Sequence, residues 1–171
     1  MKLYSVKILL PFLCLFVLGS AYPRMTGEEI GKYIQKKLKR NNQVLRINAK
    51  KLGDEGVAYL AGSSILKTVS TLIIYKGHFG DEGVRALAKS KNLDQLTALY
   101  LENNNITDLG VEYISRSKSL SKLKILNLYH NQISDKGASF IAESDTLTQL
   151  QELNLNYNQI QGPGAIKLTH S

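Results

Sequence analysis

The chain has 171 residues, of which 43% are hydrophobic and 21% are charged, so it can form one domain with a real core. Its formal net charge of +8 leaves acidic proteins, nucleic acid and anionic membranes open as partners and selects none of them. A single cysteine excludes an intramolecular disulfide.

The first segment has the layout of a secretory signal peptide. Lys2 and Lys7 precede an apolar run at 8–19, and small residues follow it up to Ala21. Twelve residues are too few to span a bilayer as a helix, so we expect cleavage near Ala21 and a secreted or extracytoplasmic chain. Cys14 lies inside this run. The mature chain would therefore contain no thiol, and the loss of two lysines would lower its formal charge from +8 to +6.

Residues 22–52 are predicted to hold a basic helix and an irregular first repeat. The helix is expected at 28–40, with an apolar stripe formed by Ile30, Ile34 and Leu38. Its other faces are basic and carry Lys32, Lys36, Lys37, Lys39 and Arg40. Such a helix can lie on anionic lipid. It also stands 27 residues before a helix of the repeats described next, which favours a capping helix.

Residues 53–171 repeat at intervals of 27 residues, and the last unit is incomplete. Two columns alternate as in a strand: Leu45, Leu72, Leu99, Leu126, Leu153 and Ile47, Ile74, Leu101, Leu128, Leu155. Two later columns lie three residues apart, as on one face of a helix: Val57, Val84, Val111, Ala138, Ala165 and Leu60, Leu87, Ile114, Ile141, Leu168. Each unit is therefore predicted to be a strand, a turn and a helix.

Three segments carry a family resemblance: LTALYLENNNI (96–106), LKILNLYHNQI (123–133) and LQELNLNYNQI (150–160). They resemble the leucine-rich repeat family, whose strand pattern is L-x-x-L-x-L-x-x-N-x-I. The segments that follow, such as GDEGVRALAKS (80–90), are similar to the ribonuclease-inhibitor-like and bacterial GALA-like subclasses. The resemblance implies an α/β solenoid of right-handed βα repeats of 27 residues, with parallel strands on the concave face and helices on the convex face. Lys50 and Gly77 replace the asparagine in the first two units.

Two polar columns are predicted to be structural. The first is an asparagine ladder, Asn104, Asn131 and Asn158, whose amides can bind backbone groups at the bend after each strand. The second is the aspartate of each Asp-x-Gly, which we expect to cap the helix that it begins, because the other ligands of a calcium loop are missing. The histidines His78, His130 and His170 share no metal-ligand spacing, and phosphate-loop and nucleophile motifs are absent. We expect no enzymatic activity, metal or cofactor.

The side chains between and after the strand leucines are predicted to form an exposed concave surface for a protein partner. The candidate contacts are Ile73, Tyr75, Lys76, Tyr100, Glu102, Asn127, Tyr129, His130, Asn154, Asn156 and Tyr157. Tyrosine is favoured at interfaces, although β-propensity alone also places aromatic residues on strands. The sequence therefore predicts a non-enzymatic protein-interaction module, with a bacterial effector or host-interaction protein as one form of it.

Two alternatives stay open at this stage. The basic N-terminal helix could bind a membrane or another acidic surface, whereas nucleic acid is a weaker option because the basic residues do not continue onto the aromatic strand surface. The chain could also be the targeting part of a larger effector enzyme. The last unit has no polar closing segment, so we expect it to fray, to self-associate or to be covered by a partner.

Overall fold

The computed structural model describes residues 24–38, 42–48 and 52–169. The predicted signal peptide, Lys39, Arg40, Lys50 and His170 lie outside these residues. The described residues form a parallel sheet with the strand order β1-β2-β3-β4-β5. The strands are β1 (Val44–Asn48), β2 (Thr71–Tyr75), β3 (Ala98–Tyr100), β4 (Ile125–Asn127) and β5 (Glu152–Asn154).

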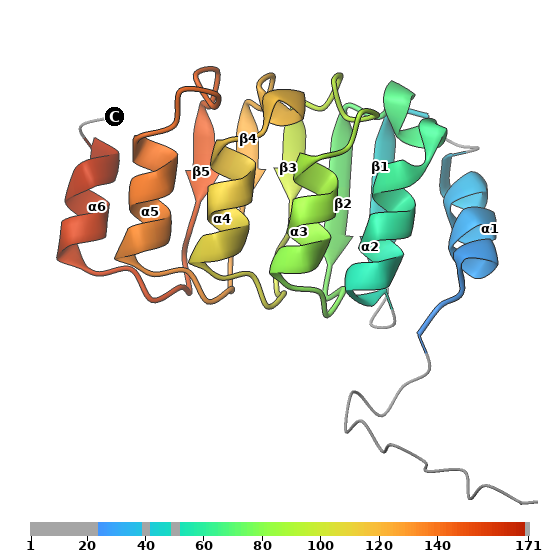
Figure 1. Cartoon of the computed structure of the whole chain (residues 1–171), viewed down its shortest axis with the longest axis horizontal. Helices are drawn as coiled ribbons and strands as arrows, with labels where there is room; N and C mark the ends of the chain where they lie inside the picture. The colour runs from blue at the N-terminus through green and yellow to red at the C-terminus, as the bar shows by residue number, and fades with distance from the viewer. Residues whose placement is uncertain (1–23, 39–41, 49–51, 170–171) are drawn as a thin grey trace, which may run out of the picture.

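Each strand is followed by a helix, and Figure 1 shows these helices standing in one row along the sheet. They are α2 (Gly53–Gly62), α3 (Asp81–Ala88), α4 (Asp108–Ser115), α5 (Asp135–Ala142) and α6 (Gly162–Thr169), and a further helix, α1 (Gly27–Leu38), precedes β1. Short 3-10 turns follow α2 and α4, at Ser64–Thr68 and Lys118–Leu120. Neighbouring parallel strands need a crossover connection, because a tight turn cannot return the chain to the same end of the sheet. The helices α2–α5 belong to these connections.

The strand register repeats the 27-residue period. Leu45 pairs with Leu72, Leu72 with Leu99, and the same step leads on through Leu126 to Leu153. The core lies between the sheet and the helices, where Leu72, Leu99 and Leu126 are fully buried with the valines of α2, α3 and α4. This arrangement confirms the predicted α/β solenoid.

The aspartates of the Asp-x-Gly columns bind the next repeat, so the prediction that each caps its own helix is wrong. Asp81 Oδ1 accepts hydrogen bonds from the backbone N–H groups of Thr107 and Gly110, each at 2.9 Å. Its Oδ2 accepts from the Thr107 hydroxyl at 2.6 Å. Asp54 and Asp108 accept the corresponding hydrogen bonds from backbone N–H groups of the repeat that follows each of them. Each carboxylate thus caps the N-terminus of the following helix and joins neighbouring units.

The glycine of Asp-x-Gly makes room for this contact. A Cβ atom at Gly110 would lie 2.6 Å from Asp81 Oδ1 and 2.7 Å from Ile106 Cγ2, both closer than real Cβ contacts. The same crowding recurs at Gly137, where Asp108 of the preceding repeat approaches. The two motif positions therefore act across the repeat boundary, with the aspartate of one unit entering the space that the glycine of the next unit leaves.

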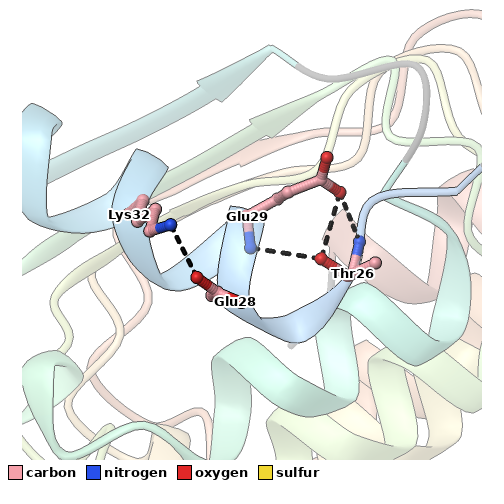
Figure 2. Close-up of polar contacts among 4 residues, drawn as sticks. All are labelled: Thr26, Glu28, Glu29 and Lys32. Atoms are coloured by element: carbon pink, nitrogen blue, oxygen red, sulfur yellow. Dashed lines mark hydrogen bonds and ion pairs between the residues drawn. The ribbon is translucent and has the colours of Figure 1, made fainter.

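Helix α1 closes the N-terminal end of the sheet. Its Ile30 and Ile34 are buried, and Leu38 packs against the core. The helix begins with a capping box: Thr26 N–H donates to Glu29 Oε2 at 2.7 Å, and Glu29 N–H donates to Thr26 Oγ1 at 3.3 Å (Figure 2). The apolar stripe thus faces the core, as expected of a cap.

The opposite end is less well covered. Leu150, Leu153, Leu155 and Ile160 are half-buried, whereas their counterparts one repeat earlier in the core are almost fully buried. Ile166 on α6 keeps 61% of its surface exposed. A groove of about 700 Å³ runs along this end, lined by Ile141, Leu147, Leu150, Leu153, Leu155 and Leu168 among others. The last unit is therefore folded but incompletely packed.

Candidate partner-binding surface

We use the term strand face for the side of the sheet turned away from α2–α6. Four columns of side chains form it. They are Val44, Thr71, Ala98, Ile125, Glu152; Arg46, Ile73, Tyr100, Asn127, Asn154; Asn48, Tyr75, Glu102, Tyr129, Asn156; and Lys76, Asn103, His130, Tyr157. The third and fourth columns stay aligned beyond the short strands, because Lys76 N–H donates to Glu102 O and Asn103 N–H donates to Tyr129 O.

The first of these columns was missed by the sequence reasoning. Ala98 and Ile125 stand two residues before the predicted contacts Tyr100 and Asn127, and alternation places them on the same side of the strand. Side chains two residues apart share one face of a strand, so the position of Tyr100 in the sequence is enough to predict this column.

The middle of the strand face is apolar and partly closed. Ile73 and Ala98 keep 8% and 5% of their surface exposed, yet neither belongs to the main core cluster. Neighbouring side chains of the face therefore cover them. Ile73 was predicted to be an exposed contact, and its burial corrects this prediction. Its side chain packs beneath the exposed side chains of the strand face. Tyr100 is half-buried beside it.

Three aromatic side chains gather at the C-terminal half of the strand face. The ring centroids of Tyr129 and Tyr157 are 4.8 Å apart, and that of His130 lies 6.1 Å from Tyr129 and 6.4 Å from Tyr157. Burial raises the pKa of the Tyr129 phenol, and Tyr157 and then Tyr75 raise this pKa further. The tyrosines of neighbouring repeats are thus close enough to act as one surface.

The fourth column has an unusual backbone conformation. Lys76, Asn103, His130 and Tyr157 have φ values of 52°, 56°, 53° and 58°. Glycine adopts this left-handed region with ease, asparagine, aspartate and histidine adopt it less often, and other side chains cost about 1–2 kcal/mol there. Yet Tyr157 stands at such a position with 71% of its surface exposed. Neither strand propensity nor core packing accounts for a tyrosine at this site.

Several residues that were predicted as polar contacts for a partner instead form hydrogen bonds with other residues of the strand face. Asn127 Nδ2 donates to Glu102 Oε1 at 2.7 Å, and Asn127 Oδ1 accepts from the Tyr129 N–H at 3.0 Å. Asn154 Oδ1 accepts from the Asn156 N–H in the same way, also at 3.0 Å. Asn127 and Asn154 therefore shape the turns. The predicted contacts whose side chains are left to meet a partner are Tyr75, Lys76, Glu102, Tyr129, His130 and Tyr157.

The asparagines of the predicted ladder bind backbone groups of two repeats. Asn104 Oδ1 accepts from the Gly77 N–H at 2.9 Å, while its Nδ2 donates to Ile74 O and Leu101 O. Asn131 and Asn158 repeat the Nδ2 contacts one and two units later. Their Oδ1 atoms accept from the N–H groups of Ile106 and Ile133, which stand two residues further along the preceding repeat than Gly77 does in its own. Asn104 and Asn131 are buried, and Asn158 is half-buried at the open end.

Within the described ranges, no group of three or more histidine, cysteine, aspartate or glutamate residues could hold a metal ion. The helices of that part of the chain include none that is long and apolar enough to cross a membrane.

Comparison with known proteins decides the family. A family profile for two leucine-rich repeats matches residues 94–140, and a single-repeat profile matches residues 146–168. The matched residues form β3 to α6, the part whose strands, asparagine ladder and aspartate caps repeat most regularly. The chain is a leucine-rich repeat protein. No curated protein sequence matches it.

The fold of this leucine-rich repeat protein is also found in a solved structure. The C-terminal domain of tropomodulin from Caenorhabditis elegans is similar over 83% of this chain and 90% of that domain, with a TM-score of 0.51 and 12% identity. An internalin from Listeria monocytogenes is 25% identical over 66% of this chain, with a TM-score of 0.42, and the match spans 35% of the internalin. The leucine-rich-repeat ectodomain of a receptor kinase from Arabidopsis thaliana is 16% identical, with a TM-score of 0.31, over 59% of this chain and 65% of that one.

Proposed function

We propose that this leucine-rich repeat protein is a non-enzymatic interaction module that binds a protein partner through its strand face. The observation that carries the proposal is the exposed Tyr157 at a left-handed position, in ring contact with Tyr129. A large aromatic side chain there costs folding free energy, and rigid aromatic area of this kind contributes strongly to protein interfaces.

The basic helix α1 is a weaker candidate surface. A helix that inserts into a membrane interface needs a free apolar side, but Ile30 and Ile34 of α1 are buried in the fold. Lys32 pairs with Glu28 at 2.6 Å, and Lys37 Nζ lies 5.4 Å from the ring centroid of Tyr33. Lys36 and Lys37 can still attract an acidic surface, so this alternative is tested alongside the strand face.

The experiment compares quantitative affinity capture by matched variants. Replacing Tyr75, Tyr129 and Tyr157 together by Ala should weaken the partner by more than about 2 kcal/mol, because buried aromatic anchors commonly dominate interface energies. Tyr59→Ala removes a 49% exposed tyrosine from α2, on the helix side, and serves as the control. Proteins that the control retains and the triple variant loses are the partners.

Reversing the charge of two lysines on α1 distinguishes binding through the strand face from binding through α1. Exchanging Lys36 and Lys37 for Glu should change mainly the salt dependence of binding to a strand-face partner. If this exchange abolishes capture while the triple tyrosine variant binds normally, the strand-face proposal is wrong and α1 is the binding surface.

We also propose that the chain is exported and that residues 1–21 are removed. The basic start and the apolar run at 8–19 support this proposal. N-terminal sequencing of the protein from an extracytoplasmic fraction should begin near Tyr22, and Met1 on a cytosolic protein would refute export. For a bacterial source, an effector or host-interaction role would follow from export and partner binding together.

A further inference from the structure

Most acidic side chains of this basic protein already have a partner within the chain. The described ion pairs join Glu28–Lys32, Glu55–Arg24, Glu82–Arg85, Glu112–Arg116 and Glu143–Lys167, while Asp54, Asp81, Asp108 and Asp135 accept backbone hydrogen bonds. Among the described residues of the strand face, the acidic side chains Glu102 and Glu152 form no ion pair. These two carboxylates face the side that we propose for the partner.

Glu102 is held in place before any partner arrives. It lies in the third column of the strand face between Tyr75 and Tyr129, and it is half-buried. The Asn127 amide donates to its Oε1 at 2.7 Å, which limits the rotation of the carboxylate and leaves Oε2 for a partner. A partly desolvated carboxylate without a cationic partner is unfavourable, and a cation supplied by another molecule would offset that cost.

The tyrosines beside Glu102 provide a second contact for a cation. Lys76 Nζ already lies 5.0 Å from the ring centroid of Tyr75, so an ammonium group does occupy a ring face on this surface. On the other side of Glu102, the paired rings of Tyr129 and Tyr157 have no described cation over them. An incoming cation would settle there, away from the positive charges of Lys76 and Arg46.

We propose that the strand face receives an arginine side chain of the partner, with its guanidinium on the Glu102 carboxylate and against the Tyr129 ring. Arginine fits better than lysine, because its planar fork binds a carboxylate through two N–H groups and stacks on an aromatic ring. This inference rests on the proposed function and names the chemistry that the same surface selects.

The test is a nuclear magnetic resonance titration of the isotope-labelled protein with the blocked tripeptide acetyl-Gly-Arg-Gly-amide. The arginine peptide should produce saturable shifts at the backbone amides of Asn103 and Tyr129. The matched peptide with glutamine in place of arginine should not. Glu102→Gln keeps an oxygen for the Asn127 amide but removes the charge, and it should weaken arginine-peptide binding by at least about tenfold. Glu82→Gln, on α3 of the helix side, is the control and should bind like the unmodified protein.

The inference is overturned if the arginine peptide gives no saturable shift, if the glutamine peptide binds equally well, or if Glu102→Gln binds like the control. Such a result leaves the proposed function standing when the triple tyrosine variant still loses its partner in the capture experiment. If that variant retains the partner, the proposed function itself fails. The two failures can therefore be separated.

Discussion

Asn131→Ala offers the sharpest test of the asparagine ladder. Asn131 has 9% of its surface exposed, and its Oδ1 accepts from the Ile106 N–H at 3.2 Å. Its Nδ2 donates to Leu101 O and Leu128 O, but these carbonyls also accept from the asparagines of the neighbouring repeats. The substitution therefore leaves one buried group, the Ile106 N–H, without a partner. A buried unsatisfied group costs about 1–3 kcal/mol, so we expect a loss of about 2 kcal/mol in the free energy of unfolding.

Equilibrium unfolding in urea, followed by far-ultraviolet circular dichroism, measures this loss. The midpoint should fall while the slope stays unchanged, and the melting temperature should fall by about 4–8 °C. Asn105→Ala is the matched control, because Asn105 is exposed and its side chain makes no described hydrogen bond. Asn103 is unsuitable as a control, since it is half-buried with a φ of 56°. If Asn131→Ala and Asn105→Ala agree within about 0.5 kcal/mol, the ladder does not stabilise the fold.

Three further predictions address other features. Gly110→Ala should destabilise the protein by about 1–3 kcal/mol in the same urea assay, because its Cβ would lie 2.6 Å from the capping aspartate oxygen. Gly62→Ala, where the Cβ meets no atom within 4 Å, should be neutral or stabilising, and equal losses for both glycines would contradict the steric argument. Hydrogen exchange should show residues 150–169 less protected than the central repeats, and equal protection in a protein that sediments as a monomer would show that the open end packs well enough alone. In an alkaline spectrophotometric titration, Tyr157→Phe should lower the raised pKa of Tyr129, and an unchanged titration curve would refute contact between the two phenols in solution. Because the folded-state pKa of Tyr129 is raised, any stability linked to it is present below its usual pKa of 10.0 and is lost as the pH rises through the folded-state value.

The repeat period made most of the fold predictable. A leucine at every twenty-seventh position fixes both the strand register and the side of the sheet that is buried, as the pairing of Leu72 with Leu99 shows. The same columns placed Val84 and Leu87 on the buried face of α3. Periodicity carries this information because every unit must bury the same apolar face against its neighbour.

Contacts between units were harder to predict. The spacing of Asp81 and Gly83 looks the same whether the carboxylate caps its own helix or the next one, so the sequence could not distinguish the two arrangements. The left-handed turn was also hidden, because Lys76, His130 and Tyr157 occupy positions where glycine would have indicated a positive φ. The burial of Ile73 depends on how neighbouring side chains lie over it, and no pattern in one strand specifies that.

The reach of each aspartate into the following unit bears on how such arrays change in length. The Asp81 carboxylate needs a glycine 29 residues later, and Asp108 needs another at the same distance. After excision or duplication of one complete 27-residue unit, the aspartate at the junction would meet a new glycine at the same distance, and every other aspartate would keep its own, because all units are in phase. An insertion of any other length would separate one such pair and bring a side chain against a carboxylate. This geometry therefore permits recombination in whole repeats and selects against shifts of phase, so related genes should differ in repeat number far more readily than in repeat length.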